Sequence, residues 1–183
     1  MKKINCLVML VLLCTAFELS AKDETNPGLI WDDASFGMGV GMDYGGIGGN
    51  LIILPQENIG IFGGVGYAIA GVGYNIGLKC RLNNVNYSPF IMAMYGYNAA
   101  ISVSNTPLGM NLDKLFYGPT VGLGLDYRSS VKNRTYWSFA ILIPIRDTEV
   151  QNYIDYLKKT WGVEFKNDLL PIGFSVGIKF IIN

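Results

Sequence analysis

The stretch GVGYNIGLKCRL, residues 71–82, alternates strictly between two kinds of side chain. One set is apolar or aromatic, and the other consists of glycine, asparagine, lysine and arginine. Successive side chains of a β-strand point to opposite faces, so this pattern predicts a strand. One face of that strand is apolar, and the other carries small, polar or charged side chains.

The same alternation recurs along most of the 183-residue chain. Short turns such as Ala70-Gly71 join neighbouring runs, which favours antiparallel pairing of consecutive strands. We therefore expect an all-β fold, a closed antiparallel up-and-down barrel of about eight strands. The predicted strands cover residues 36–44, 47–54, 59–69, 71–82, 88–103, 117–127, 136–145 and 172–182.

The chemistry of the two faces indicates which side of the barrel meets lipid. A run of about 11 residues, tilted by about 45°, spans roughly 25 Å, the height of the apolar band of a transmembrane barrel. Glycine weakens a strand on a solvated surface but suits a narrow interior. We expect the apolar face to point outward, with an aromatic girdle near the strand ends formed by Tyr44, Tyr67, Tyr117, Tyr127 and Trp137.

The first residues predict export. Two lysines, an apolar run and small residues near Ala21 are typical of a secretory signal peptide over residues 1–21. Residues 22–35 are expected to form a periplasmic N-terminal tether, and residues 36–183 the barrel. Lipidation at Cys14 is the alternative, but Leu13 precedes it where a small residue is usual. Cys80, the single cysteine after the signal, is expected to pack on the apolar face.

The small face carries a few charges that would lie in the lumen. In a narrow interior such charges must pair or be hydrated, so we expect an ion-paired plug; a proton or ion path is the alternative. The predicted lumen charge cluster consists of Asp43, Lys79, Arg81, Asp126 and Lys179. Four large apolar residues are also expected to face inward and would line a pocket for a hydrophobic molecule, namely Phe62, Phe90, Met92 and Met94.

The longest interruption, residues 146–170, contains apolar residues at helical spacing. It predicts an amphipathic helix over 148–161, capped by Asp147 or Thr148, in the last extracellular loop. Its apolar stripe, with Tyr153, Leu157 and Trp161, would fold over the barrel mouth or the membrane interface; alternatively it offers a docking surface.

The last strand places Gly177 three residues before Phe180. This spacing looks like the assembly signal of Gram-negative outer-membrane barrels. Together with the signal peptide and the alternating strands, it makes the chain resemble the small outer-membrane β-barrel family (OmpA/OmpX-like) over nearly its whole length. The resemblance implies residence in the outer membrane, contact with outer-membrane lipid and recognition by the barrel-assembly machinery.

Several function classes are disfavoured by composition. The chain has no histidine, which removes the usual hydrolase and metal constellations, and its formal net charge of zero argues against nucleic acid. We expect no enzyme activity, cofactor or metal. A loop carboxylate pair, Asp155 with Glu164 or Asp168, is the one catalytic alternative, and solvation is its ordinary explanation.

Three functional hypotheses follow. The first is a non-enzymatic, porin-like surface barrel that acts structurally or through its extracellular loops on an unknown ligand or protein partner. The second is a barrel that transports or binds a small hydrophobic molecule. The third is a soluble periplasmic binding barrel.

Overall fold

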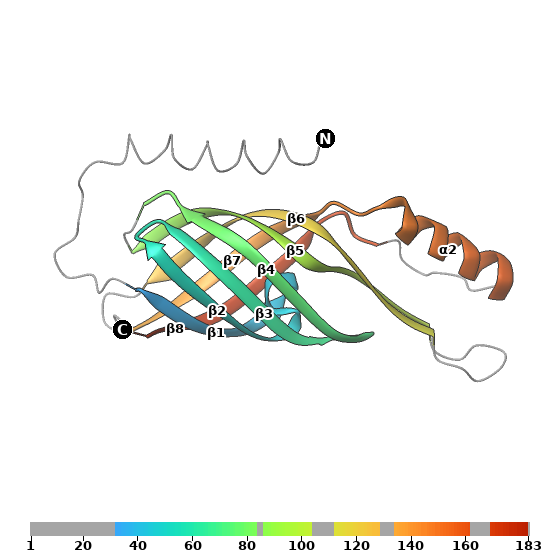
Figure 1. Ribbon diagram of the computed structural model, residues 1–183, viewed down its shortest axis with the longest axis horizontal. Helices are drawn as coiled ribbons and strands as arrows, with labels where there is room; N and C mark the ends of the chain where they lie inside the picture. The colour runs from blue at the N-terminus through green and yellow to red at the C-terminus, as the bar shows by residue number, and fades with distance from the viewer. Residues whose placement is uncertain (1–31, 84–85, 104–111, 129–133, 162–168, 183) are drawn as a thin grey trace.

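The computed structural model describes residues 32–83, 86–103, 112–128, 134–161 and 169–182 (Figure 1). The predicted signal peptide, residues 22–31 of the predicted tether and the carboxylates Glu164 and Asp168 lie outside the described residues.

Eight strands form a closed barrel in which each strand pairs with its neighbours along the chain. All pairs are antiparallel, including the one between the first strand and the last. The predicted fold class is confirmed. The strands are β1 (Ala34–Gly41), β2 (Gly46–Gln56), β3 (Ile59–Ala68), β4 (Gly71–Arg81), β5 (Tyr87–Val103), β6 (Leu112–Arg128), β7 (Thr135–Pro144) and β8 (Gly173–Ile182).

The two ends of the barrel differ. The start of β1 and the end of β8 lie at one end, while β5 and β6 continue past the barrel wall at the other (Figure 1). The α-helix α2, Thr148–Trp161, follows β7 at that same far end, with the bounds predicted from the sequence. Asp147 Oδ1 accepts hydrogen bonds from Thr148 N and Oγ1 at its start. No helix in the described part of the chain is long and apolar enough to cross a membrane.

The outward and inward faces have the predicted chemistry. Ile76 is 62% exposed on the outer face, whereas its neighbour Asn75 is 3% exposed on the inner face. The exposed large hydrophobic residues occur on all eight strands, among them Val40, Ile53, Val65, Ile76, Tyr95, Leu123, Ile141 and Val176. Tyr67, Tyr117 and Trp137 of the predicted girdle are exposed, and Tyr127 is partly exposed. Cys80 is buried.

The prediction is wrong at the end of the first strand. Residues Met42–Tyr44 form a 3₁₀ turn, η1, that folds into the barrel, and Tyr44 is completely buried there instead of joining the girdle. Gly41, Gly45 and Gly46 have positive φ angles, which reverse the chain within a few residues. The barrel also begins earlier than predicted, because Ser35, assigned to the tether, belongs to β1.

Strands β5 and β6 are paired over more residues than predicted. Strand β6 begins at Leu112, five residues before the predicted strand 117–127. The register shifts between Tyr97 and Ala99, and this bulge leaves Asn98 without a partner residue opposite it. Beyond the bulge, Ala99, Ile101 and Val103 are buried. We call this part of the two strands, residues 98–103 and 112–117, the β5–β6 extension.

Candidate functional site

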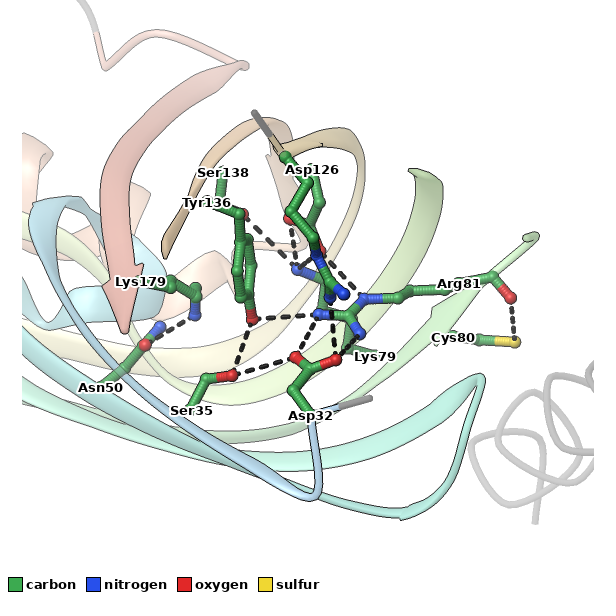
Figure 2. A network of polar contacts seen from close by, with 11 residues as sticks. Asp32, Ser35, Asn50, Lys79, Cys80, Arg81, Asp126, Tyr136, Ser138 and Lys179 are labelled. Carbon is green, nitrogen blue, oxygen red and sulfur yellow. Dashed lines mark hydrogen bonds and ion pairs between the residues drawn. The ribbon is translucent and has the colours of Figure 1, made fainter. Parts of the chain in front are cut away.

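The lumen near the start of β1 contains an ionic network, which we call the terminal cluster (Figure 2). At its centre Arg81, on β4, donates Nη1 to Asp32 Oδ1 at 2.9 Å and Nη2 to Asp32 Oδ2 at 3.0 Å. Arg81 Nε also donates to Asp126 Oδ2 at 3.0 Å. The guanidinium is thus held in the forked geometry that arginine makes with carboxylates. The cluster comprises Asp32, Ser35, Lys79, Arg81, Asp126, Arg128, Tyr136 and Ser138.

Further contacts complete the cluster around its two carboxylates. Lys79 Nζ lies 2.8 Å from Asp126 and 3.7 Å from the centre of the Phe90 ring. Arg128 Nη2 donates to Asp32 Oδ1 at 2.8 Å. All four charged partners of these pairs are buried, so the pairing offsets a large desolvation cost.

Two hydroxyl groups link the cluster to β1 and β7. Tyr136 Oη accepts from Arg81 Nη2 at 3.0 Å and donates to Ser35 Oγ at 3.2 Å. Ser35 Oγ in turn donates to Asp32 Oδ2 at 3.0 Å. Asp32 itself precedes β1, so the chain before the first strand contributes a carboxylate to the inside of the barrel.

The two arginines control the ionisation of Asp32. Burial alone would raise the pKa of this carboxyl group, but the charges and hydrogen bonds of Arg81 and Arg128 outweigh it and lower the pKa to about 2. Asp32 is therefore ionised throughout the neutral range.

A second polar group surrounds η1 inside the barrel. Ser175 Oγ donates to Asp43 Oδ1, Asn50 Nδ2 donates to the Asp43 carbonyl, and Asn75 Nδ2 donates to the Met42 carbonyl. Lys179 Nζ donates to Asn50 Oδ1 at 2.6 Å and lies 5.4 Å from the centre of the Tyr44 ring. Side chains from β2, β4 and β8 thus hold the inward turn in place.

Inner-face glycines make room for η1. A Cβ at Gly39 would lie 2.8 Å from Tyr44 Cε2, and one at Gly177 would overlap Tyr44 Oη. Cβ atoms at Gly48, Gly64 and Gly66 would overlap the backbone of Asp43 and Tyr44. The lumen is therefore narrow, as predicted, because η1 occupies part of it.

The five predicted lumen charges are all buried inside the barrel, but they do not form one cluster. Lys79, Arg81 and Asp126 belong to the terminal cluster, whereas Asp43 and Lys179 lie in the group around η1. No ion pair within 4 Å joins Asp43 to a lysine among the described residues. The sequence interpretation missed Asp32 and Arg128. Arg128 was recognisable, since it continues the face of Asp126.

The predicted apolar lumen residues do come together. Phe62, Phe90, Met92 and Met94 are buried in one cluster with Ile52, Leu54, Ala140 and Leu142. They are packed against one another and against Met42 of η1, so their shared role in the structure is that of a core.

The apolar stripe of α2 packs on the β5–β6 extension. Leu157 is completely buried and belongs, with Val150, to a cluster that includes Ala99, Ile101, Val103 and Phe116 of the β5–β6 extension. Tyr153 packs edge-on against the Phe116 ring, with 5.6 Å between centroids. These residues of the stripe are therefore buried between α2 and the extension. Trp161 is the last residue of α2, and its side chain lies outside the described residues.

The residues of the predicted assembly signal lie on opposite faces of β8. Gly177 faces the lumen against Tyr44, and Phe180 is exposed on the outer face. No group of three histidine, cysteine or acidic side chains able to hold a metal ion occurs among the described residues.

Comparison with known proteins gives a likeness of fold. No protein-family model matches the sequence, and no curated protein is significantly similar to it. Among solved structures, the N-terminal β-barrel domain of Pseudomonas aeruginosa OprF superposes with a TM-score of 0.50. The match is 13% identical in sequence and covers 81% of this chain and 97% of that chain. This chain thus shares the β-barrel fold of that outer-membrane domain.

Proposed function

We propose that this chain is an integral outer-membrane protein whose barrel is a plugged anchor and whose β5–β6 extension and α2 form the surface that acts outside the cell. The observation that carries the proposal is the ring of exposed aliphatic and aromatic side chains around the whole barrel, with the polar and charged side chains of the strands buried inside. A contiguous apolar surface of this extent is unfavourable in water and favourable in lipid. Barrel closure also pairs the backbone groups that hydrocarbon cannot satisfy.

The orientation follows from the connections. Barrels of this kind have short periplasmic turns and longer external loops. In this chain the turns on the side of the termini are short, whereas α2 and the β5–β6 extension lie at the other end. We therefore place the terminal cluster on the periplasmic side and α2 outside. Export by residues 1–21 and recognition of Gly177 and Phe180 by the barrel-assembly machinery remain part of this proposal.

The other two hypotheses have less support. A transport barrel needs space between Phe62, Phe90, Met92 and Met94, and these residues pack together. A soluble periplasmic barrel would expose Ile76, Leu123 and Val176 to water.

Spin labels test the proposal directly. Cys80→Ala removes the only cysteine after the predicted signal, and single cysteines at positions 76, 123 and 176 then carry labels on the outer face. After reconstitution in vesicles, these labels should be accessible to oxygen and protected from a water-soluble paramagnetic nickel complex. A matched label at Tyr156, exposed on α2, should show the reverse. Preferential access of the nickel complex to the three barrel positions would contradict membrane insertion.

A further inference from the structure

We propose that lipid of the outer leaflet covers the outer ends of β1–β4, so that only the β5–β6 extension and α2 project beyond the membrane. The inference rests on the proposed membrane insertion and extends it from the barrel wall to the turns. The surface in question, which we call the apolar rim, consists of Val40, Ile47, Tyr67, Ile69 and Val72.

The apolar rim is a continuous row of side chains across four strands. Val40 is opposite Ile47 on the neighbouring strand, and Ile47 is opposite Tyr67. Tyr67 is in turn opposite Val72, and neighbouring strands lie about 5 Å apart. Ile69, in the turn after β3, is 82% exposed, more than any other large apolar residue in the described part of the chain. A contiguous exposed patch of this kind marks an interaction surface.

The connections at the apolar rim do not extend away from the barrel. β3 ends at Ala68 and β4 begins at Gly71, so only residues 69–70 connect these strands. The connection between β1 and β2 contains η1, which folds into the lumen. By contrast, β5 and β6 continue past the barrel wall, and α2 follows β7 at the same end (Figure 1). One half of the outer end is therefore short, and the other half projects.

The distribution of charge follows the same division. Between Tyr44 and Leu78 the single charged residue is Glu57, which lies in the turn at the opposite end of the barrel. The charged residues of the β5–β6 extension and around the start of α2 are Asp113, Lys114, Asp147 and Glu149. Charged groups are costly in hydrocarbon, whereas an uncharged turn is not. The short half is thus suited to lipid and the projecting half to water.

A hydrogen bond at the apolar rim satisfies backbone that water would otherwise solvate. Among the described residues, β4 pairs with β5 only from Asn75 onward. Before that point Tyr117, on β6, donates its Oη to the Val72 carbonyl at 3.3 Å, and its ring lies 4.9 Å from that of Tyr74. In lipid both the carbonyl and the phenol hydroxyl need such a partner, because water is absent there.

The shape of the rim favours lipid over a second copy of the chain. The row lies on the convex outside of the barrel and continues the exposed apolar wall formed by Val65 and Ile76. Acyl chains follow a convex surface, whereas a rigid partner touches it along a narrow line. A stable protein interface takes about 20–30 residues from each side, far more than the five of the rim. An external partner would therefore meet the β5–β6 extension and α2 alone.

Spin labels on the full chain in lipid vesicles test the inference. In the Cys80→Ala protein, Ile47→Cys and Ile69→Cys place labels on the rim. Ser102→Cys, on the exposed side of the β5–β6 extension, is the matched control at the same end of the barrel. The ratio of oxygen to nickel-complex accessibility at positions 47 and 69 should be closer to that at position 76 than to that at position 102.

The other outcomes separate this inference from the proposed function. If the rim labels match position 102 while position 76 reports lipid, the barrel is inserted and the inference is wrong. If position 76 itself reports water, membrane insertion fails. Protection of position 69 from both reagents, with dipolar broadening between labels, would place a second copy on the rim and would also overturn the inference.

A charge on the rim provides an independent measurement. Ile69→Arg should lower the folding equilibrium constant in lipid vesicles about fivefold, because a cation then lies at the edge of the hydrocarbon. Ser102→Arg, at the same end of the barrel, is the control and should change this constant little. Equal effects of the two substitutions would contradict lipid at Ile69.

Discussion

Arg81 and Asp32 are joined by two parallel hydrogen bonds of 2.9 and 3.0 Å inside the barrel, although Asp32 precedes the first strand and Arg81 ends the fourth. The chain before β1 is therefore fastened to the far wall of the lumen.

Replacing Arg81 should be costly because it leaves two buried carboxylates with fewer partners. We expect Arg81→Met to lower the free energy of unfolding by about 3–5 kcal/mol, since Asp32 and Asp126 both lose a charged partner. Arg81→Lys keeps the charge but loses the fork and should fall between Arg81→Met and the natural protein. Urea unfolding in micelles, followed by circular dichroism, measures both. A loss below about 0.5 kcal/mol in Arg81→Met would contradict a structural role for the cluster.

The pKa of Asp32 predicts a dependence of stability on acid. Its value is about 2 in the folded chain and 3.8 unperturbed, so its contribution is complete above about pH 4 and is lost as the pH falls through about 2. Between pH 5 and pH 2 the natural protein should lose about 2 kcal/mol more stability than Asp32→Asn. Unfolding curves of the two proteins across this range provide the measurement. Parallel pH profiles would show that Asp32 is not paired in solution.

Two substitutions of Tyr44 distinguish the contribution of its ring to stability from that of its hydroxyl group. The ring is completely buried, and Oη has no hydrogen-bond partner among the described residues. Tyr44→Phe should therefore be neutral or slightly stabilising. Tyr44→Ala should cost about 3–5 kcal/mol, because it empties the space beside Gly39 and Gly177. If both variants lost equal stability in urea, the hydroxyl would have a role that this packing does not explain.

A charge on the outer face should interfere with the membrane-spanning surface. Ile76→Arg places a cation on the exposed side of β4 and should cost about 2–4 kcal/mol if this position lies near the bilayer midplane. Tyr156→Arg, on exposed α2, is the control and should cost little. Folding equilibria in lipid vesicles distinguish the two. Equal tolerance of both changes would argue against lipid at Ile76.

The attachment of α2 should depend on Leu157. This residue is fully buried, whereas Tyr156, next to it, is 52% exposed. Leu157→Ala should weaken packing on the β5–β6 extension by about 2–5 kcal/mol, and Tyr156→Ala should have a small effect. Amide hydrogen exchange over residues 148–161 should accelerate in Leu157→Ala while the barrel strands stay protected. Unchanged exchange would show that the helix is held elsewhere.

The barrel was predictable because each strand has one face in contact with the core and one without it. A period of two, as in residues 71–82, then fixes both the strand and its orientation. The helix was predictable for a similar reason, since Val150, Tyr153 and Leu157 recur at helical spacing and pack on one cluster.

The inward turn was not predictable from periodicity. The alternation of Met38 and Val40 continues through Met42 and Tyr44, so the pattern alone extends the strand. What ends it is backbone conformation, with Gly45 at φ 70° and Gly46 at φ 111°, together with space that glycines on other strands provide. Such space depends on contacts between residues far apart in the chain.

Only part of the terminal cluster was predictable from the sequence. Lys79, Arg81 and Asp126 lie on clear strand faces, and their burial follows from the alternation. Asp32 lies before the first strand, so no alternating pattern assigns its side chain to the inner or outer face. Only closure of the barrel brings it to Arg81.

Gly39 and Gly177 are directly opposite each other where the first and last strands join, and the Tyr44 ring rests on both. A slip of this seam by two residues would exchange Gly177 for Ser175 or Lys179, whose side chains have no room beneath the ring. The turn inside the lumen therefore selects the register of barrel closure. Among the β1–β8 alignments that would keep the apolar side chains outside, it favours the one that leaves room for the Tyr44 ring.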